Sequence, residues 1–291
     1  MTPDASTGYP VLSGETLVVP ILGDPIAQVK SPDGVTRALV ARGRDAVVVP
    51  MHVLPDDLDT VIRGLGPVRS IAGLIATVPH KFGLAAHCAT LTDRAAFLGS
   101  VNVARRNPDR TWYGDQVDGA AFVAACRANG LRMSEEPTPP GGGSSVRTTV
   151  LDGARALQVG AGGAGSAIAL ALLDAGVAEL TLHDADPARL DALTGRLRDR
   201  FGDRVTTGPA DPAGYGIVAN ATPMGMREGD PLPVDVARLK PDTFVGDVIT
   251  KPAVSPLVAA ARRIGCGTST GTDMFAAVSG LIVDFLVEEE S

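Results

Sequence analysis

The sequence predicts an α/β fold made of two domains, and three observations predict it. The length of 291 residues suggests about two domains of roughly 150 residues each. In both halves short apolar segments alternate with longer segments of helical pattern, which is typical of open sheets covered by helices. Residues 134–149 are rich in Pro, Gly and Ser without periodicity, so we expect a flexible surface loop between the halves.

The first half predicts strand, helix, strand, helix, strand. The strands are expected at residues 17–22, 46–50 and 70–78, and the helices at residues 32–42 and 54–65. Pro79 is expected to end the third strand, because proline cannot donate to a sheet.

The second half repeats this alternation. Its strands are expected at residues 154–160, 179–184, 216–222 and 243–249, and its helices at residues 163–175, 187–201, 256–264 and 273–287. Pro187 stands at the start of its helix, where proline is tolerated.

Composition excludes several classes of protein. Lys and Arg number 26 and Asp and Glu number 33, and the resulting net charge of −7 argues against nucleic-acid binding. Apolar residues at 45% and charged residues at 20% are ordinary for a globular protein. The first residues lack the pattern of a signal peptide, and no apolar run is long enough to span a membrane. We therefore expect a cytoplasmic protein with no membrane partner.

Cysteine and histidine spacing gives no sign of a metal site. The three cysteines are Cys88, Cys126 and Cys266. They are far apart and form no CxxC pair, so we expect small buried apolar residues in a reduced environment. The spacing of His52, His87 and His183 is not typical of metal ligation, and we predict no metal.

A glycine-rich motif follows a predicted strand and opens a predicted helix. Each glycine of Gly160-Ala-Gly-Gly-Ala-Gly165 has a mechanical reason in a dinucleotide-binding turn. Gly160 makes the tight turn, Gly162 lets the backbone approach a pyrophosphate, and Gly165 lets helix and strand pack closely. Gly163 and Ala164 begin the helix, whose N-terminal N–H groups favour phosphate. The motif predicts a Rossmann-type cofactor site.

Asp184 lies at the predicted end of the next strand, where a carboxylate can accept hydrogen bonds from the adenosine ribose. It would repel the 2′-phosphate of NADP, so NAD is expected as the preferred cofactor. Asp184 could instead cap the helix at 187–201, but Asp186 is the better candidate for that cap.

Five stretches give the chain a resemblance to the shikimate and quinate dehydrogenases. They are GDPIAQVKSP at 23–32, TVPHK at 77–81, GSVN at 99–102, GDQVDG at 114–119 and NATPMGM at 220–226. The resemblance runs from Val19 to Leu286, with the glycine-rich motif between the fourth and fifth stretches. It implies an NAD(P)-dependent dehydrogenase that oxidises a ring alcohol or reduces the ketone, in a cleft between a substrate-binding and a Rossmann domain.

The resemblance implies that Lys81 and Asp118 form the catalytic pair. Removing a hydroxyl proton while a hydride leaves the same carbon needs groups that hold and move that proton, and a Lys–carboxylate pair can do this. The alternatives are a solvated charge at a helix start for Lys81 and an N-cap of the helix at 119–129 for Asp118. His80 is a neighbour of Lys81 rather than the base. On the cofactor side the resemblance implies Asn220, Thr222 and Met224.

Several substrate positions depart from the family pattern, and most become apolar. Ser31, Thr77 and Asn102 are retained as candidate substrate ligands. The departures are Val29 and Thr250 in place of Ser and Tyr, Ile75 in place of Asn, Gln116-Val117 in place of Asn-Thr, and Val278 in place of Gln. A substrate hydroxyl left without a partner costs about 1–3 kcal/mol, so shikimate is not expected to be the main substrate.

The expected domains are residues 1–119 with the C-terminal helix 272–291 for substrate binding and catalysis, and residues 120–271 for the dinucleotide. The expected partner is a small cyclic carboxylate, and the chain is expected to be a monomer or a homodimer. Two alternatives stay open: an ordinary shikimate or quinate dehydrogenase, and a non-catalytic NAD-binding regulatory protein.

Overall fold

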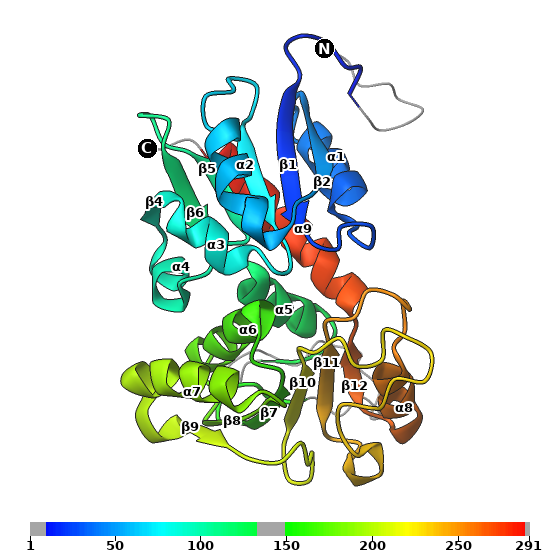
Figure 1. The fold of residues 1–291 in the computed structure, drawn as a ribbon. Helices are drawn as coiled ribbons and strands as arrows, with labels where there is room; N and C mark the ends of the chain where they lie inside the picture. Colours follow the sequence, from blue (N-terminus) through cyan, green and yellow to red (C-terminus); the bar gives the residue numbers. More distant parts are fainter. Residues whose placement is uncertain (1–9, 133–148, 289–291) are drawn as a thin grey trace. The chain divides into compact units, whose positions relative to one another are not determined.

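The computed structural model describes residues 10–132 and 149–288, and the chain divides into two compact units (Figure 1). Unit 1 comprises Met1–Val117 and Val278–Ser291, and unit 2 comprises Asp118–Ala277. Within the described residues each unit has a six-stranded sheet with helices packed on it, so the predicted α/β fold class is confirmed. The assignment of substrate to the first part and dinucleotide to the second stays a prediction.

The sheet of unit 1 has the strand order β2-β1-β3-β5-β6-β4. Its strands are β1 (Leu17–Gly23), β2 (Ala46–His52), β3 (Gly73–Ala76), β4 (Cys88–Leu91), β5 (Val103–Arg106) and β6 (Trp112–Asp115). The first three are parallel, β5 is antiparallel to both β3 and β6, and β4 is parallel to β6. The parallel half was predicted, and the mixed half was not.

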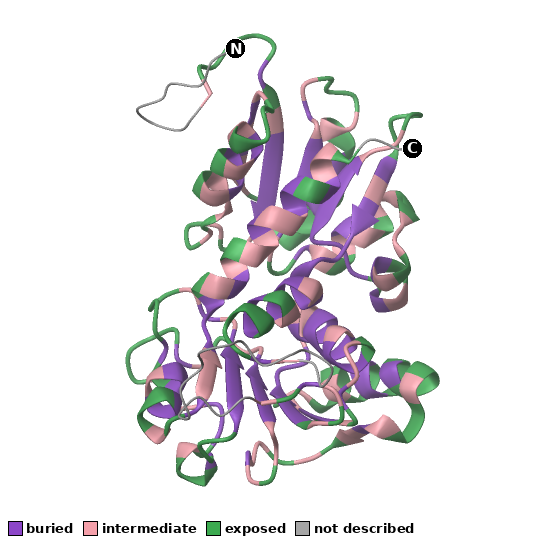
Figure 2. Cartoon of the chain, turned by 180° about the vertical axis from the view of Figure 1, so that it is seen from behind, coloured by how far each residue is buried: buried purple, intermediate pink, exposed green. Residues whose placement is uncertain are grey.

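The two faces of this sheet bury different side chains because successive residues of a strand point to opposite sides. The helices are α1 (Ser31–Ala41), a 3₁₀ turn at Pro55–Asp57, α2 (Leu58–Leu65), α3 (Lys81–Ala86), α4 (Asp93–Leu98) and the C-terminal half of α9 (Gly271–Val287). Helices α1 and α9 pack on one face, and α2, α3 and α4 pack on the other. Figure 2 shows the strands buried between them.

The sheet of unit 2 is parallel throughout and has the order β12-β11-β10-β7-β8-β9. Its strands are β7 (Arg155–Val159), β8 (Glu179–His183), β9 (Val205–Thr207), β10 (Ile217–Asn220), β11 (Phe244–Asp247) and β12 (Gly267–Ser269). Numbered along unit 2 this is the order 3-2-1-4-5-6 of dinucleotide-binding folds, in which the strand order reverses between β7 and β10.

Helices also flank the sheet of unit 2. They are α5 (Asp118–Ala128), α6 (Gly163–Asp174), α7 (Pro187–Phe201), α8 (Pro256–Ile264) and 3₁₀ turns at Gly202–Arg204 and Val236–Arg238. Helix α8 packs on one face against Val159, Val218 and Val245. On the other face α5 places Phe122 so close to Gly246 that a side chain there would overlap its ring.

Five strands of the described residues were not predicted from the sequence, because they are short and have little apolar pattern. Strands β4, β5 and β6 are four residues each, β9 and β12 are three each, and β4 has no fully buried residue. The predicted strand at 70–78 is shorter, because Ile71 makes an isolated bridge to Val18 and the chain turns after Ala76. The predicted loop at 134–149 lies, except for Thr149, outside the described residues.

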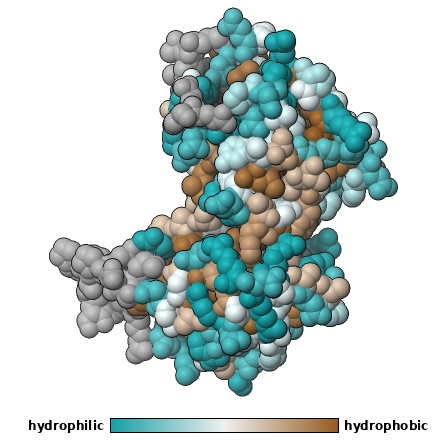
Figure 3. Space-filling model, turned by 90° about the vertical axis from the view of Figure 1, so that its left-hand side faces the viewer, coloured by the Kyte–Doolittle hydropathy of each residue, from teal (hydrophilic) through white to brown (hydrophobic). Residues whose placement is uncertain are grey.

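Apolar residues are exposed among polar ones on the face in Figure 3. No helix in residues 10–132 or 149–288 has the length and apolar character to cross a bilayer. The cytoplasmic location stays a prediction.

Cys126 and Cys266 are buried as expected, whereas Cys88 is half-buried. Burial raises the pKa of the Cys88 and Cys126 thiols to about 12, so both stay protonated at neutral pH.

Candidate active site

The glycine-rich turn lies at the carboxyl end of β7, beside the point where the strand order reverses. Gly160 has φ +107°, and a Cβ there would lie 2.7 Å from the carbonyl oxygen of Ala221. A Cβ at Gly165 would overlap the carbonyl oxygen of Gly160. Both glycines are therefore required by the turn itself, and the turn packs directly on the loop after β10.

Gly162 is different, because apart from its chain neighbours no described atom lies within 4 Å of the position its Cβ would take. It is the N-cap of α6 and has no side chain to occupy the helix N-terminus. Gly163 and Ala164 open that helix, whose first N–H groups lack partners within the helix. The open space over a bare helix N-terminus fits a pyrophosphate, so the residues present fit a dinucleotide.

A buried glutamine that was not predicted from the sequence holds this turn in place by hydrogen bonds. Gln158 is fully buried on β7, and its Nε2 donates to the carbonyl oxygens of Gly160 at 2.8 Å and Gly165 at 2.7 Å. An isolated polar residue inside the apolar strand was the available signal.

Asp184 and Asp186 follow β8, and their carboxylates are already engaged. Asp184 accepts from the N–H groups of Ala161 at 2.6 Å and of Asp186 at 2.8 Å, and the guanidinium of Arg189 lies 3.6 Å away. Asp186 caps α7 by accepting from the N–H groups of Ala188 and Arg189, so the capping prediction is confirmed. Asp184 thus ties its loop to the glycine-rich turn.

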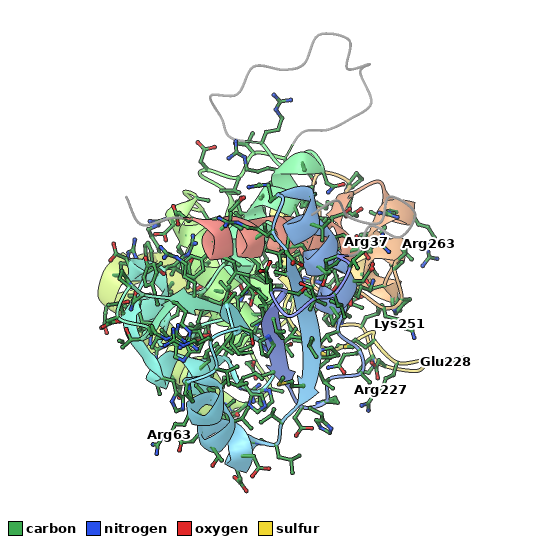
Figure 4. The ribbon with its side chains drawn as sticks, turned by 90° about the horizontal axis from the view of Figure 1, so that it is seen from above. Arg37, Arg63, Arg227, Glu228, Lys251 and Arg263 are labelled. Carbon is green, nitrogen blue, oxygen red and sulfur yellow. The ribbon has the colours of Figure 1, made fainter. Side chains whose placement is uncertain are left out.

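The loop after β10 contains the three other predicted cofactor residues. The Oδ1 atom of Asn220 accepts from the N–H and the hydroxyl of Thr222, at 3.1 and 2.7 Å. The Thr222 hydroxyl in turn accepts from the N–H of Met224 at 3.1 Å. These bonds fold the loop back over the end of β10. Figure 4 shows Arg227 and Glu228, further along this loop, and Lys251, after β11, pointing outward.

A buried aspartate, Asp247, lies below this loop and was not predicted. It ends β11, pairs in register with Asn220, and is 1% exposed. It accepts from Asn220 Nδ2 at 3.1 Å, from the N–H of Ile249 at 3.0 Å and from the Ser255 hydroxyl at 2.6 Å. A charged residue ending an apolar strand was the signal that could have identified it.

In unit 1 the loops after β1 and β3 pack on each other. A Cβ at Gly23 would overlap the methyl group of Thr77, so glycine is needed for this contact. The N–H of Asp24 donates to the carbonyl oxygen of Val78 at 3.0 Å. Thr77 is thereby fixed at the start of the turn that leads into Lys81.

The same region brings Lys81, Asn102 and Val117 together. The N–H of Val101 donates to the carbonyl oxygen of Lys81 at 2.9 Å, and Asn102 Oδ1 accepts from the N–H of Val117 at 3.0 Å. Lys81 is half-buried at the first position of α3. Asp118 is buried and begins α5 in unit 2, so its pairing with Lys81 stays a prediction.

His80 is 2% exposed, and its Nε2 donates to the carbonyl oxygen of Val53 at 2.7 Å. This bond gives His80 a structural role in holding the turn before α3 against the segment after β2. Among the described residues no group of three or more His, Cys, Asp and Glu side chains is placed to hold a metal ion.

The four apolar departures from the family pattern belong to one cluster. Val117 and Ile75 are core members at 1% and 3% exposure, and Val29 and Val278 are partly buried members packed against them. Ser31, half-buried, begins α1 two residues after Val29. Gln116 is buried and its Nε2 donates to the Ser100 hydroxyl at 3.1 Å.

Comparisons with known proteins agree on one family. The model of the shikimate dehydrogenase substrate-binding domain matches residues 21–104. A curated shikimate dehydrogenase (NADP(+)) of Rubrobacter xylanophilus is 36% identical over 268 residues, which cover 90% of this chain and 87% of the relative. The corresponding enzyme of Rhodospirillum rubrum is 32% identical over 269 residues, which cover 91% and 89%.

Solved structures agree over most of the chain. Quinate dehydrogenase from Corynebacterium glutamicum in complex with NAD has a TM-score of 0.78 and 26% identity, over 94% of both chains. Shikimate 5-dehydrogenase from Thermus thermophilus, in complex with NADP(H) and shikimate, has a TM-score of 0.78 and 25% identity, also over 94% of both. A 5-ketofructose reductase of Gluconobacter, at 22% identity and a TM-score of 0.78, shares the fold.

Taken with the curated relatives, the parallel sheet of unit 2 and its glycine-rich turn place the chain among the nicotinamide-dependent oxidoreductases that act on a CH–OH group. The chain belongs to the shikimate/quinate dehydrogenase family, as the sequence resemblance implied. This membership leaves the non-catalytic alternative without support.

The expected preference for NAD over NADP is wrong, because the curated relatives are NADP(+)-dependent enzymes. The physical reason lies in the surroundings of Asp184. Its two oxygens accept backbone N–H groups and Arg189 lies beside it, so it is not a free carboxylate directed at a ligand.

Proposed function

We propose that this chain is a dehydrogenase for a cyclic hydroxy acid whose ring has fewer hydrogen-bonding groups than shikimate. The observation that carries the proposal is the joining of Val29, Ile75, Val117 and Val278 in one apolar cluster of unit 1. Four departures from the family pattern that lie in one cluster indicate that this one region of unit 1 has changed, rather than four unrelated positions. Val29 and Val278 are its partly exposed members and are the ones we expect to meet substrate.

Valine at these positions carries a free-energy cost for a substrate with several hydroxyls. A substrate hydroxyl that is buried against valine loses its water and gains no partner, at about 1–3 kcal/mol each. Every 1.4 kcal/mol changes the binding constant about tenfold. Two such hydroxyls would therefore lower kcat/KM for shikimate by orders of magnitude, whereas an analogue lacking them would gain apolar contact.

The retained polar residues supply the chemistry of the proposal. Ser31, Thr77 and Asn102 would contact the remaining polar groups of the substrate. Lys81 and Asp118 would hold the reacting hydroxyl and take its proton as the C–H bond breaks and the C=O bond forms. The bound dinucleotide supplies the hydride acceptor for this carbon, or the donor in the reverse direction.

The dinucleotide would be held by the turn from Gly160 to Gly165 and by the loop that contains Asn220, Thr222 and Met224. NADP(+) is the form used by the curated relatives, and we take it as the cofactor to test first. Asp184 would act through the turn, since it accepts the N–H of Ala161.

The first test measures formation of reduced nicotinamide by purified protein, with NADP(+) and NAD in separate assays, on shikimate, quinate and their deoxy analogues. We expect a deoxy analogue to have the highest kcat/KM. Lys81→Ala should lower kcat by about 10²–10⁴-fold, the usual contribution of a general acid–base group. Lys240→Ala, which changes an exposed lysine of unit 2, is the matched control.

Two valines of α9 provide a matched pair for the substrate side. Val278 and Val287 both pack partly buried against the same cluster, about 13 Å apart along the helix. Val278→Gln should raise kcat/KM for shikimate about tenfold over the wild type, and Val287→Gln should not. Shikimate as the best substrate of the wild type, with no gain from Val278→Gln, would overturn the proposal.

The second candidate is an ordinary shikimate or quinate dehydrogenase. It is favoured by the relatives named shikimate dehydrogenase and by the retention of Lys81, Asn102 and Asp118. Lys81-dependent turnover of shikimate or quinate ahead of every deoxy analogue would establish it.

A further inference from the structure

We propose that Asp247 is a positioning residue that holds two loops of unit 2 in the shape that receives the nicotinamide half of the dinucleotide. The inference rests on the dinucleotide site of the proposed function. It adds a residue that touches no ligand and acts through Asn220 and Ser255.

Asp247 has its carboxylate fully engaged inside the protein. At 1% exposure it accepts from Asn220, from the N–H of Ile249 and from the Ser255 hydroxyl, at 3.1, 3.0 and 2.6 Å. All three donors are neutral. Burying a carboxylate among neutral donors is unfavourable for stability, so its presence needs a reason beyond packing.

The first loop that it fixes is the loop after β10. Asn220 donates to Asp247 with Nδ2 and accepts from Thr222 with Oδ1, so the carboxylate determines which way the amide faces. The Thr222 hydroxyl then accepts from the N–H of Met224. A chain of hydrogen bonds thus runs from Asp247 to the backbone of Met224.

The second loop, residues 248–254, is closed at both of its ends by the same carboxylate. Ile249 N–H lies two residues after Asp247, and the Ser255 hydroxyl lies eight residues after it. Between them residues 251–254 are exposed, and Lys251 points outward (Figure 4). Ser255 also caps α8 by accepting from the N–H of Val258 at 3.2 Å.

The two loops contact each other, so one residue can control both. A Cβ at Gly225, in the first loop, would lie 3.4 Å from Pro256 and 3.5 Å from the side chain of Ile249. The start of α9 packs on the second loop, because a Cβ at Gly271 would overlap the backbone of Ile249.

The strand order indicates which half of the dinucleotide these loops receive. In this fold the pyrophosphate lies at the turn after β7 and the adenosine ribose lies toward the end of β8. Strands β10 and β11 are on the opposite side of β7 in the sheet (Figure 1). The loops tied to Asp247 therefore face the half that carries the nicotinamide.

The test separates positioning from general stability by comparing each dinucleotide with its fragment that lacks nicotinamide. Calorimetry measures the Kd of NADP(+) and of 2′-phospho-ADP-ribose, and likewise of NAD and ADP-ribose, for the full-length protein. Ser255→Ala should weaken the dinucleotides about tenfold, the effect of one hydrogen bond to a charged group, and leave the fragments within about twofold. Ser255→Thr should restore the wild-type Kd.

Amide hydrogen exchange of the ligand-free protein provides a readout independent of binding. Ser255→Ala should speed exchange in residues 221–226 and 248–254. Asp235→Ala, which removes the cap of the 3₁₀ turn at Val236–Arg238, is the control that should change neither exchange there nor any Kd. Asp247→Asn, if folded, should repeat the Ser255→Ala pattern more strongly.

Two results would overturn the proposal: equal weakening of dinucleotide and fragment, or a dinucleotide Kd within twofold of the wild type in Ser255→Ala. Failure of the dinucleotide site would look different, because the wild type itself would then bind no dinucleotide. Failure of the substrate proposal, with shikimate as the best substrate, would leave all of these Kd values unchanged.

Discussion

Each unit buries an aspartate at the end of a strand, and the two aspartates have different partners. Asp115 ends β6 of unit 1 and accepts from Arg94 Nε at 2.7 Å and from the Thr92 hydroxyl at 2.5 Å. Asp247 ends β11 of unit 2 and accepts from neutral donors. Both are nearly inaccessible, at 2% and 1% exposure.

The difference follows from what each aspartate holds. Asp115 also accepts the N–H of Gln116, and so it anchors the segment that leads to Val117 and Asp118. A cation partner makes this tie strong and specific in geometry. Asp247 holds two loops by weaker bonds. A buried charge with a cation stabilises the frame of unit 1, and a buried charge without one is retained in unit 2 for loop shape.

The largest effect expected from this comparison is on the stability of unit 1. Arg94→Ala would leave Asp115 buried without its cation, and breaking a buried pair costs about 3–5 kcal/mol. Because the Arg94 side chain is 42% exposed, solvent screening reduces this cost. We expect the free energy of unfolding, measured by urea denaturation, to fall by about 2–3 kcal/mol.

The control for Arg94→Ala is Arg37→Ala. Arg37 pairs with Asp33 at 2.8 Å with both side chains more than half exposed. An exposed pair of this kind contributes about 0.5 kcal/mol or less. Equal losses in the two variants would mean that Asp115 does not depend on its cation, and the comparison would fail.

The second effect is on the dinucleotide site of unit 2. Gly162 has φ −74°, and apart from its chain neighbours no described atom lies within 4 Å of its Cβ position, so alanine fits the ligand-free fold. The added methyl group would stand where the pyrophosphate approaches the backbone. Gly162→Ala should raise the dinucleotide Kd about tenfold, or about 1.4 kcal/mol, without lowering the unfolding temperature.

Gly195→Ala is the matched control for Gly162→Ala. Gly195 lies inside α7, and apart from its own turn of helix no described atom lies within 4 Å of its Cβ position. Alanine there should stabilise the fold by about 0.5–1 kcal/mol and leave the dinucleotide Kd unchanged. An unchanged Kd in Gly162→Ala as well would mean that phosphate does not approach the backbone at this turn.

The sequence predicted regions where local pattern decides the structure. Helices α7 and α8 begin and end at the predicted residues, because their prolines fix the start and their apolar faces have helical period. The glycine-rich turn was predicted for the same reason, since Gly160 and Gly165 each answer a steric need of the chain itself.

The sequence did not predict features that depend on distant partners. The side-chain donors to Asp247 come from 27 residues before it and from 8 residues after it, and Asp115 is bonded to Arg94 from 21 residues before. Neither spacing has a sequence pattern. Asp184 was misinterpreted for the same reason: its N–H donor at Ala161 lies 23 residues away, so its engagement could not be seen before the fold was known.

The smallest expected effect is a pH dependence of stability that comes from Asp247. Burial raises the pKa of this carboxyl. It outweighs the hydrogen bonds from Ser255, Ile249 and Asn220, which act in the opposite direction. Its folded pKa therefore lies above its unfolded pKa of about 3.9, and between the two values the folded protein binds more protons than the unfolded chain. The stability that the protonated Asp247 carboxyl contributes is fully present below the unfolded pKa, and it is lost as the pH rises through the folded pKa.

Asp247→Asn removes this titration, so the free energy of unfolding of the wild type minus that of the variant should fall as the pH rises from about 4 toward neutral. Urea denaturation at a series of pH values measures this difference. The same series on Ser255→Ala should shift the fall to higher pH, because a hydrogen bond to the ionised form is lost. A difference that stays flat with pH, or that rises, would contradict the raised pKa of Asp247. It would mean that the neutral donors offset the cost of burying the charge, so that the absence of a cation partner has no consequence for stability in unit 2.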